Sequence, residues 1–310
     1  MSRAYVLVSP CKDESQHIER TLTSVLNQTE PPALWVIVDD GSSDDSAEIV
    51  ERYMADMPYL RLVRRTSGDR AVGGGVVRAF NQGLDDVDVP YDYICKLDVD
   101  LDLPKAYFAN LMDRMEQNAN LGSCSGKPYY NDPKTGELLP EVVGEENAIG
   151  AAKFFRAAAF EDIGGFETDV GWDGYDGHLA RWHGWDCRLW DDEDIRFLHL
   201  RPMGSSHQNI GTGRIRHGRG QYLIGTHPIY FLISTAFRAV RQRPYFSGAY
   251  YQAVGFFRAM REKEDRFGSA DIIRFIRAYQ FSALRKGKLA AAEEAAAKRR
   301  QALGINRAAL

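Results

Sequence analysis

Two aspartates separated by one apolar residue form the strongest local signal for chemistry in this sequence. Asp98 and Asp100 follow the apolar run Tyr93-Ile94-Cys95, which predicts a strand. Carboxylates at positions i and i+2 at a strand end suit a hard divalent cation such as Mg²⁺ or Mn²⁺. Such an ion can bridge a carboxylate to a diphosphate and neutralise the charge of a departing group. Acidic loops supply such triplets by chance, so the surrounding sequence decides what this one means.

Two more polar clusters follow predicted strands. The first strand, Tyr5 to Val8, runs into the polar loop 9–14, and the second, Trp35 to Val38, ends in Asp39-Asp40-Gly41-Ser42. Turn chemistry, with Ser43 or Asp44 as the cap of the next helix, is the alternative for this cluster, but it gives no reason for the paired aspartates. In open α/β sheets, ligands bind beyond the carboxyl ends of the strands. Three polar clusters at one edge therefore predict a ligand site.

The spacing of apolar residues predicts the elements that position these clusters. Strand-like runs alternate with helical periodicity over the first hundred residues, as in 18–26 and 47–54. Such alternation indicates βαβ units and a Rossmann-like, mostly parallel sheet covered by helices on both faces. The predicted fold class is therefore α/β. We expect a nucleotide-binding half at 1–104, an acceptor half at 105–210 and a C-terminal helical extension at 211–310.

Composition excludes some classes of protein and partner. The chain has 310 residues, 44% of them hydrophobic and 26% charged, with a formal net charge of −4, so it does not match a nucleic-acid backbone. The four cysteines have no metal-binding spacing and predict reduced, mostly buried thiols, as in a cytoplasmic enzyme. A strand begins near the N-terminus without the pattern of a signal peptide. The apolar run 229–240 is too short to span a membrane and predicts a buried or interfacial helix.

Taken together, the motifs resemble those of the family 2 glycosyltransferases of the GT-A fold. That family uses nucleotide-sugar donors and inverts the anomeric centre. The resemblance extends over about residues 4 to 201 in the expected order, and each motif alone is weaker than the set. The matching segments are Pro10 with Asp13-Glu14, Gln28-Thr29, Val38-Asp39-Asp40-Gly41-Ser42, Asn81-Gln82-Gly83-Leu84 and Leu97-Asp98-Val99-Asp100.

The resemblance implies a role for each matching position. Asp98 would contact the ribose or the metal, and Asp100 would be the principal ligand of Mn²⁺ or Mg²⁺. Arg70, beside Gly73-Gly74-Gly75, is expected to reach the diphosphate, because a guanidinium binds phosphate bidentately and glycines allow a mobile loop. An exposed, solvated charge is an equal alternative for Arg70. The expected nucleotide-sugar-binding residues are Ser9, Pro10, Glu14, Asp39, Asp40, Arg70 and Asp98.

A histidine supplies the second expected metal ligand. His199 follows the strand-like run 195–198, where relatives often place a histidine that ligates the metal in some of them. A lone histidine is more often structural, and His207, eight residues later, is the weaker candidate. The donor implied by the resemblance is a UDP-sugar, and the acceptor is a saccharide or a lipid-linked glycan.

The second half must supply a base that deprotonates the acceptor hydroxyl. In the family this is an aspartate about ten residues after Gly-Gly-Phe, which matches Gly164-Gly165-Phe166 here. Asp173 takes the catalytic position, with Asp176 as the alternative, and Trp172 replaces the usual glutamate. Capping of the following helix is the alternative role for Asp173, and the two roles are compatible, because a helix N-terminus favours an ionised carboxylate. The tryptophans of this region predict either a sugar-stacking surface or core packing, and they are Trp172, Trp182, Trp185 and Trp190.

The C-terminal hundred residues interleave arginines with aromatics between 222 and 260. This pattern predicts either an amphipathic surface in peripheral contact with a membrane or a helical cap with its arginines in solvent. Residues 289–300 predict an alanine-rich helix with little to bury. Two other functions remain open: a sugar-phosphate nucleotidyltransferase, for which the first loop lacks a basic glycine-rich signature, and a non-catalytic carbohydrate- or membrane-binding module, which leaves the three acidic clusters unexplained.

Overall fold

The computed structural model describes residues 3–65, 74–201, 210–241 and 245–307. A central seven-stranded sheet has the order β10-β6-β9-β4-β1-β2-β3. Every strand of this sheet runs parallel to the others except β9, which is antiparallel to both of its neighbours. The predicted α/β class with a mostly parallel sheet is therefore confirmed. The strands are β1 (Tyr5–Cys11), β2 (Leu34–Asp39), β3 (Leu60–Arg64), β4 (Tyr93–Leu97), β6 (Leu121–Gly126), β9 (Ala152–Arg156) and β10 (Asp186–Trp190).

Helices cover both faces of the sheet, as the nearly continuous burial of its strands requires. One face packs on α1 (Ile18–Leu26), α2 (Ser46–Tyr53) and α4 (Tyr107–Gln117). The other packs on α3 (Gly74–Asp85), α5 (Ala157–Asp162) and α6 (Trp172–Trp182). A side chain at Gly83 would collide with Val8 and Val38, so this glycine lets α3 approach β1 and β2 closely. The Asn81–Leu84 segment thus packs α3 against the sheet.

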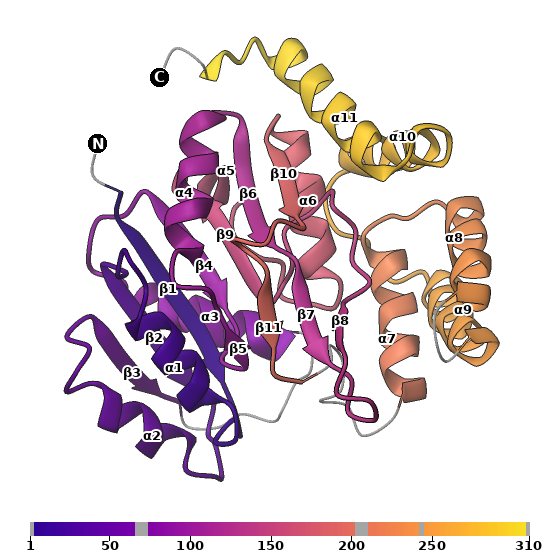
Figure 1. Ribbon diagram of the computed structural model, residues 1–310. Helices are drawn as coiled ribbons and strands as arrows, with labels where there is room; N and C mark the ends of the chain where they lie inside the picture. The colour runs from indigo at the N-terminus through magenta and orange to yellow at the C-terminus, as the bar shows by residue number, and fades with distance from the viewer. Residues whose placement is uncertain (1–2, 66–73, 202–209, 242–244, 308–310) are drawn as a thin grey trace.

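A smaller sheet lies beside the carboxyl edge of the large one (Figure 1). Its order is β5-β11-β7-β8, with the bounds β5 (Leu101–Asp102), β7 (Pro128–Asn131), β8 (Leu138–Pro140) and β11 (Phe197–His199). The β5–β11 pair joins residues from both expected halves, and so does the β4–β9 pair of the large sheet. The nucleotide-binding and acceptor halves therefore share their sheets.

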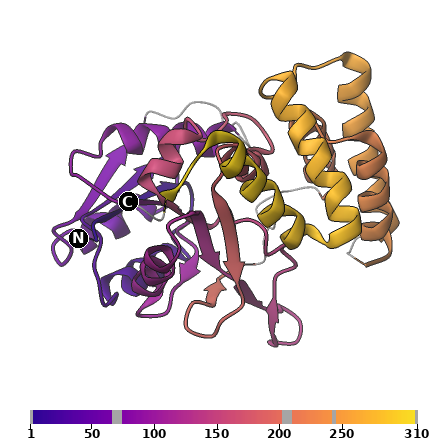
Figure 2. The same ribbon diagram turned by 90° about the horizontal axis from the view of Figure 1, so that it is seen from above.

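From Ile210 on, each described element is a helix (Figure 2). Helices α7 (Ile210–Leu223) and α9 (Tyr245–Glu262) cross closely at Gly218 and Gly255, where a Cβ atom would meet the backbone of the other helix. The other helices are α8 (Pro228–Arg241), α10 (Ala270–Lys286) and α11 (Lys288–Leu303). No helix within the described ranges is long and apolar enough to cross a membrane.

The structure corrects some local expectations. Helix α2 starts at Ser46, later than the predicted cap at Ser43 or Asp44, because the Asp44 carboxylate accepts from the Ser46 amide (3.1 Å). The alanine-rich helix α11 does bury a face: its alanines pack against α10, and Arg299 donates to the Trp182 carbonyl (2.7 Å). The four cysteines are free and buried, as predicted.

Candidate active site

Three acidic segments meet at the carboxyl edge of the large sheet. Strand β1 lies between β4 and β2, and all three run parallel, so the turns that follow them emerge side by side. Asp39 ends β2, Glu14 lies in the loop after β1, and Asp98 and Asp100 follow β4. The strand order agrees with the prediction that these clusters share one edge of the sheet.

Asp100 is held by two cationic side chains. Its Oδ2 atom lies 2.7 Å from Nε of Arg201 and 3.4 Å from Nε2 of His199. Burial opposes ionisation of Asp100, but the hydrogen bonds and charges of His199 and Arg201 outweigh it and lower the carboxyl pKa. An ionised carboxylate this deeply buried needs a cation beside it. The backbone confirms the convergence, since the Leu200 amide donates to the Asp100 carbonyl (2.9 Å).

His199 lies between two buried carboxylates. Its Nδ1 atom is 3.0 Å from Oε1 of Glu141, a residue that the sequence prediction did not include. Burial disfavours the charged ring, but Asp100 and Glu141 outweigh this cost and raise the His199 pKa to about 10. A carboxylate behind a histidine fixes the orientation of its ring, as behind many metal-ligating histidines. Glu141 lies after β8, so only the pairing of β11 with β7, and of β7 with β8, brings it close.

Arg201 connects the β1 loop to the Asp100 cluster. Its guanidinium forms an ion pair with Glu14 while it also bonds Asp100. Burial raises the pKa of Glu14 to about 7, against the attraction of Arg201 and with further help from Asp100. Arg201 was absent from the predicted site, and a pairing across 187 residues leaves no local pattern in the sequence. Glu14 therefore lies with the expected metal ligands as well as beside the nucleotide turn.

Asp98 has a different partner from Asp100. Its carboxylate forms an ion pair with the buried ammonium of Lys96, which also donates to the Gly150 carbonyl (2.9 Å). The surrounding protein raises the Asp98 pKa, with Asp100 adding to the effect and Lys96 opposing it. About a third of the Asp98 side chain (34%) is nevertheless exposed. Asp98 is therefore accessible to a ligand, while Asp100 lies deeper.

The turn after β2 is held by its own aspartate. Oδ1 of Asp39 accepts from the Ser42 amide (3.0 Å), so the turn chemistry weighed for this cluster does apply to Asp39. Asp40 pairs with Arg65 (2.8 Å), and its carbonyl accepts from Lys12 (3.0 Å). Asp40 thus sits between two cations near the candidate nucleoside site.

Two expected pocket residues lie in the β1 strand itself. Ser9 is fully buried, and its hydroxyl accepts from the indole N–H of Trp35 (2.9 Å), so its side chain belongs to the core beneath the strand ends. Pro10 is partly buried and lies opposite Val38 in the β1–β2 register. The predicted Arg70 and the weaker candidate His207 lie outside the described residues. Gly74 and Gly75, expected in a loop beside Arg70, instead begin α3.

The two candidate bases have opposite environments. Asp173 lies exposed in the first turn of α6, whose cap is Gly171, so the expectation that Asp173 caps the helix is wrong. Asp176 is buried and pairs with the buried ammonium of Lys153 (2.5 Å). That ammonium also donates to the Asp173 carbonyl (2.8 Å). Of the two carboxylates, Asp173 alone is open to an acceptor.

Asp173 also lies near the β4 end of the site. Its carboxylate side chain borders Gly150, whose carbonyl is the acceptor for Lys96. Trp172, which replaces the usual glutamate, is buried below it, with the ammonium groups of Lys96 and Lys153 5.6 and 5.3 Å from the ring centre. A cation near a desolvated aromatic face is stabilised by the ring quadrupole. Trp172 therefore packs in the core and does not offer a sugar-stacking face.

The side chains around Asp100 are suited to part of a metal's coordination shell. Within the described residues, no three His, Cys, Asp or Glu side chains are arranged to hold an ion. Asp100 and His199 do supply one carboxylate and one imidazole, and Arg201 places a positive charge on the same Asp100 oxygen. Mg²⁺ and related ions commonly take one or two protein carboxylates and complete their shell with substrate phosphates and water. The residues therefore fit a metal that is bound together with a diphosphate.

A parallel sheet with acidic turns at its carboxyl edge, faced by an exposed helix-borne carboxylate, is the architecture of a nucleotide-dependent transferase. The chain belongs to glycosyltransferase family 2, because the family model "Glycosyl transferase family 2" matches residues 6–164. Poly-beta-1,6-N-acetyl-D-glucosamine synthases are similar in sequence: that of Staphylococcus epidermidis is 25% identical over 177 residues, and that of Staphylococcus aureus strain COL is 26% identical over 179. Each match covers 52% of this chain and only 41% of the relative.

Solved glycosyltransferases share the fold over nearly the whole chain. S. aureus TarS residues 1–349, in complex with UDP-GlcNAc, has a TM-score of 0.59 and 15% identity, with 96% of this chain and 92% of that chain covered. The mannosyltransferase PcManGT from Pyrobaculum calidifontis, in complex with GDP-Man and Mn²⁺, has a TM-score of 0.51 and 19% identity over 96% and 86%. The fold is therefore that of the GT-A glycosyltransferases, as the sequence motifs implied.

Proposed function

We propose that this protein transfers a sugar from a nucleoside-diphosphate sugar to an acceptor hydroxyl, with inversion at the anomeric carbon. The observation that carries the proposal is the meeting of Asp100, His199 and Glu14 at one sheet edge, with Asp173 exposed across Gly150. Testing for release of the nucleoside diphosphate from a panel of donors, with and without acceptor, checks the activity. A folded protein that releases none from any donor would contradict the proposal.

The reaction exchanges one C–O bond at the anomeric carbon for another and transfers one proton. The acceptor oxygen attacks the anomeric carbon, the bond from that carbon to the diphosphate oxygen breaks, and the acceptor proton passes to Asp173. An aspartate in the first turn of a helix stays ionised at low cost, which suits it to accept a proton from a positioned hydroxyl. Asp176 is tied to Lys153, which leaves Asp173 as the better candidate.

The site has the residues for a divalent metal, Mn²⁺ or Mg²⁺. Asp100 and His199 would hold the ion, which when bound would offset the charge of the departing diphosphate. Arg201 bonds the same carboxylate and presents a guanidinium that can also contact phosphate oxygens. The mannosyltransferase complex that contains Mn²⁺ supports a metal in this fold.

The donor and acceptor follow from the relatives. UDP-GlcNAc in the TarS complex and the poly-N-acetylglucosamine synthases support a UDP-sugar donor and a saccharide acceptor, which remain proposals for this chain. A thermal-shift panel of nucleotide sugars with Mn²⁺ would identify the donor, since a ligand that binds only the folded state raises the melting temperature. The competing nucleotidyltransferase and binding-module functions are not supported, because the chain is a family 2 glycosyltransferase.

Nucleotide binding should depend on Asp40. Asp40→Ala leaves Arg65 without its partner and removes an acceptor for the nucleoside, so we expect the affinity for the nucleoside diphosphate to fall by about 1–3 kcal/mol. Calorimetry of UDP binding measures this. The matched control is Asp88→Ala, which removes the exposed partner of Arg61. Equal affinity of a folded Asp40→Ala protein and the wild type would remove Asp40 from the pocket.

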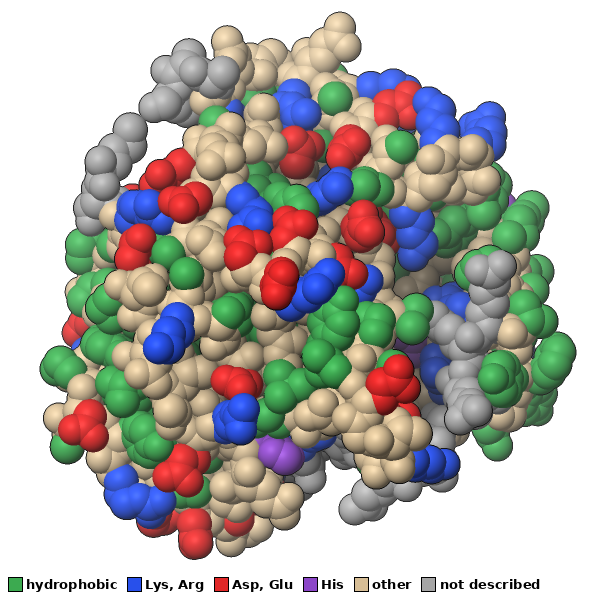
Figure 3. All heavy atoms as spheres, viewed as in Figure 1, with side chains coloured by type: hydrophobic (Ala, Val, Ile, Leu, Met, Phe, Trp, Pro, Cys, Tyr) green, Lys and Arg blue, Asp and Glu red, His purple; other side chains and the backbone are tan. Residues whose placement is uncertain are grey.

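Helix α8 has its apolar face turned outward. The exposed positions of its outer face are all apolar, with relative exposures of 47–61% for the large side chains, and Figure 3 shows hydrophobic side chains gathered over α8 and α9. A helix of a globular protein normally buries this stripe. We therefore infer peripheral contact with a membrane, with aromatics of α9 at the interface. The large outward side chains are Ile229, Leu232, Ile233, Phe237 and Val240.

Membrane contact should be lost when charge is placed on this face. The double variant Leu232→Glu/Ile233→Glu should reduce the fraction bound to phosphatidylglycerol-containing vesicles by at least about tenfold, because each side chain contributes on the order of 1.5–3 kcal/mol on burial. Vesicle co-sedimentation measures the effect. Leu284→Glu, at an exposed position of α10, is the control. Equal binding by the double variant and the wild type, or no binding by the wild type, would contradict membrane contact through α8.

A further inference from the structure

The inner side of α8 carries an arginine without a counterion. Arg238 is partly buried, and its Nη2 atom donates to the Ser234 hydroxyl (3.2 Å), while its Nε atom is buried without a hydrogen-bond partner. None of the described carboxylates pairs with it. Burial, together with the nearby Arg214, lowers the Arg238 pKa, although Tyr230 opposes this. A buried guanidinium without an anion is costly, and an anionic ligand would relieve that cost.

Two side chains of α7 lie near Arg238. Arg214 and His217 lie within electrostatic reach of Arg238, and the surrounding protein atoms together with the two arginines lower the pKa of His217, whose side chain stays exposed. The Gln252 amide nitrogen is 2.8 Å from Nδ1 of His217 and donates to it, which leaves the ring proton on Nε2. The place therefore offers two guanidinium groups and an imidazole N–H, all of them donors. This donor set suits an anion.

The cluster is next to the candidate base. Helix α7 packs on the start of α6, where a Cβ atom on Gly220 would lie 3.2 Å from the Val170 carbonyl and 3.3 Å from the Gly171 amide. Asp173, two residues later, is close enough for its charge to act on His217. The cluster consequently lies on the same side of the site as the candidate base Asp173.

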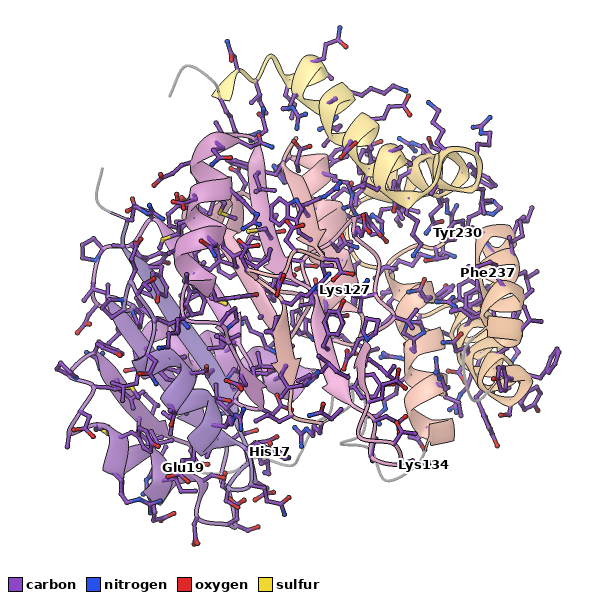
Figure 4. The ribbon with its side chains drawn as sticks, in the orientation of Figure 1. His17, Glu19, Lys127, Lys134, Tyr230 and Phe237 are labelled. Atoms are coloured by element: carbon purple, nitrogen blue, oxygen red, sulfur yellow. The ribbon has the colours of Figure 1, made fainter. Side chains whose placement is uncertain are left out.

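An aromatic ring lies beside Arg238. Tyr230 lies on the side of α8 that faces α7 (Figure 4). Tyr230 is near enough to Arg238 to influence its ionisation. The inner side of α8 therefore combines a cationic group with aromatic surface, directly behind the apolar outer face. A ligand that carries both a phosphate and an apolar chain would find complementary groups here.

We propose that Arg214, His217 and Arg238 bind a phosphate group carried by the acceptor, so that the acceptor class is a phosphate-bearing glycan. The inference rests on the proposed transfer reaction and specifies its acceptor. Arginine forks bind phosphate oxygens in pairs, and the His217 N–H adds a third direction. The phosphate is a handle and takes no part in bond making: it positions the acceptor hydroxyl toward Asp173. A phosphate of a lipid carrier and a phosphodiester of a polymer share this chemistry.

The test uses two phosphate probes and two uncharged analogues. Calorimetry is done on the full chain with saturating UDP and Mg²⁺, so that the diphosphate site is filled. Farnesyl phosphate represents the lipid source, glycerol 3-phosphate represents the polymer source, and farnesol and glycerol are their uncharged analogues. We expect the phosphates to bind at least tenfold more tightly than the analogues. Tighter binding of farnesyl phosphate than of glycerol 3-phosphate indicates a lipid carrier, and equal binding of the two indicates a polymer.

Arg238→Gln should weaken binding of both phosphates at least tenfold while UDP binding is unchanged. Because the wild-type guanidinium has no counterion among the residues that the structure describes, this variant should melt no lower than the wild type, whereas loss of a structural arginine would lower the melting temperature. Arg258→Gln, an exposed position of α9, is the matched control and should bind the probes normally. His217→Gln provides a second variant if Arg238→Gln fails to fold, and it too should weaken phosphate binding.

Equal phosphate affinity in the wild type, Arg238→Gln and His217→Gln would overturn the inference, as would absence of phosphate binding to the wild type. Diphosphate release from the donor, measured on the same samples, separates the two proposals. Release without phosphate binding rejects only the anion site. Phosphate binding that depends on Arg238, in a protein that never releases diphosphate, supports the anion site and rejects the transfer reaction.

Discussion

Asp173→Asn is expected to lower the transfer rate by about 10²–10⁴-fold while donor binding stays nearly intact. The substitution keeps the shape of the side chain and removes its basicity, and positioned proton transfer contributes an effect of this size. Asp173 is exposed in the first turn of α6, so the change should cost little stability. The measurement is kcat with saturating donor and acceptor, together with calorimetry of donor binding.

Asp176→Asn provides the comparison. Asp176 forms a buried pair with Lys153, and removing one partner of such a pair commonly costs about 3–5 kcal/mol of stability. We expect this variant to unfold at lower denaturant concentration, while any folded fraction retains turnover. Near-normal turnover in Asp173→Asn with a folded but inactive Asp176→Asn would move the base to Asp176. Full activity in both would place the base elsewhere.

Loss of Asp100 should have the largest effect at the diphosphate end. Asp100→Ala is expected to reduce turnover to background, because it removes the buried carboxylate that would hold the metal and that orients Arg201 and His199. Chelation of wild-type protein with EDTA should also abolish transfer, and Mn²⁺ or Mg²⁺ should restore it only in the wild type. Electron paramagnetic resonance of Mn²⁺ titrated with UDP gives a readout that does not depend on turnover.

A nearby carboxylate serves as the control for this substitution. Asp102→Ala removes the partner of the exposed Arg20, two residues beyond Asp100, and should change neither metal binding nor turnover appreciably. Circular dichroism and thermal unfolding must show that Asp100→Ala is folded before its activity is interpreted. Full turnover by chelated wild-type protein would reject the metal.

The sequence by itself determined the fold class and the edge of the sheet where the site lies. Strand periodicity and the polar turns after β1, β2 and β4 are local properties, and parallel neighbours bring such turns together whatever covers them. The acidic residues Asp98 and Asp100, and Asp173 after the Gly-Gly-Phe turn, could therefore be named without a structure. Their roles in catalysis and metal binding still stand as predictions.

Tertiary structure decided which side chains surround these acidic residues. Glu141 and Arg201 are separated from their partners by 58 and 101 residues or more, and only the pairing in the second sheet brings them to Asp100 and His199. Burial likewise separated Asp173 from Asp176, three residues apart on one helix, because Lys153 of β9 pairs with one of them and leaves the other open. Neither distance nor burial is encoded locally.

Long-range packing also decides which faces of the C-terminal helices are exposed. Periodicity shows that α8 has an apolar face, but which face is covered depends on the helices packed against it, and in α8 the apolar stripe faces outward while Arg238 faces inward. Phe231 of α8 stacks on Phe256 of α9 with ring centroids 4.0 Å apart, so the packing of α8 on α9 decides which of its sides is covered. A local pattern fixes what a segment can bury, and long-range packing fixes what it does bury.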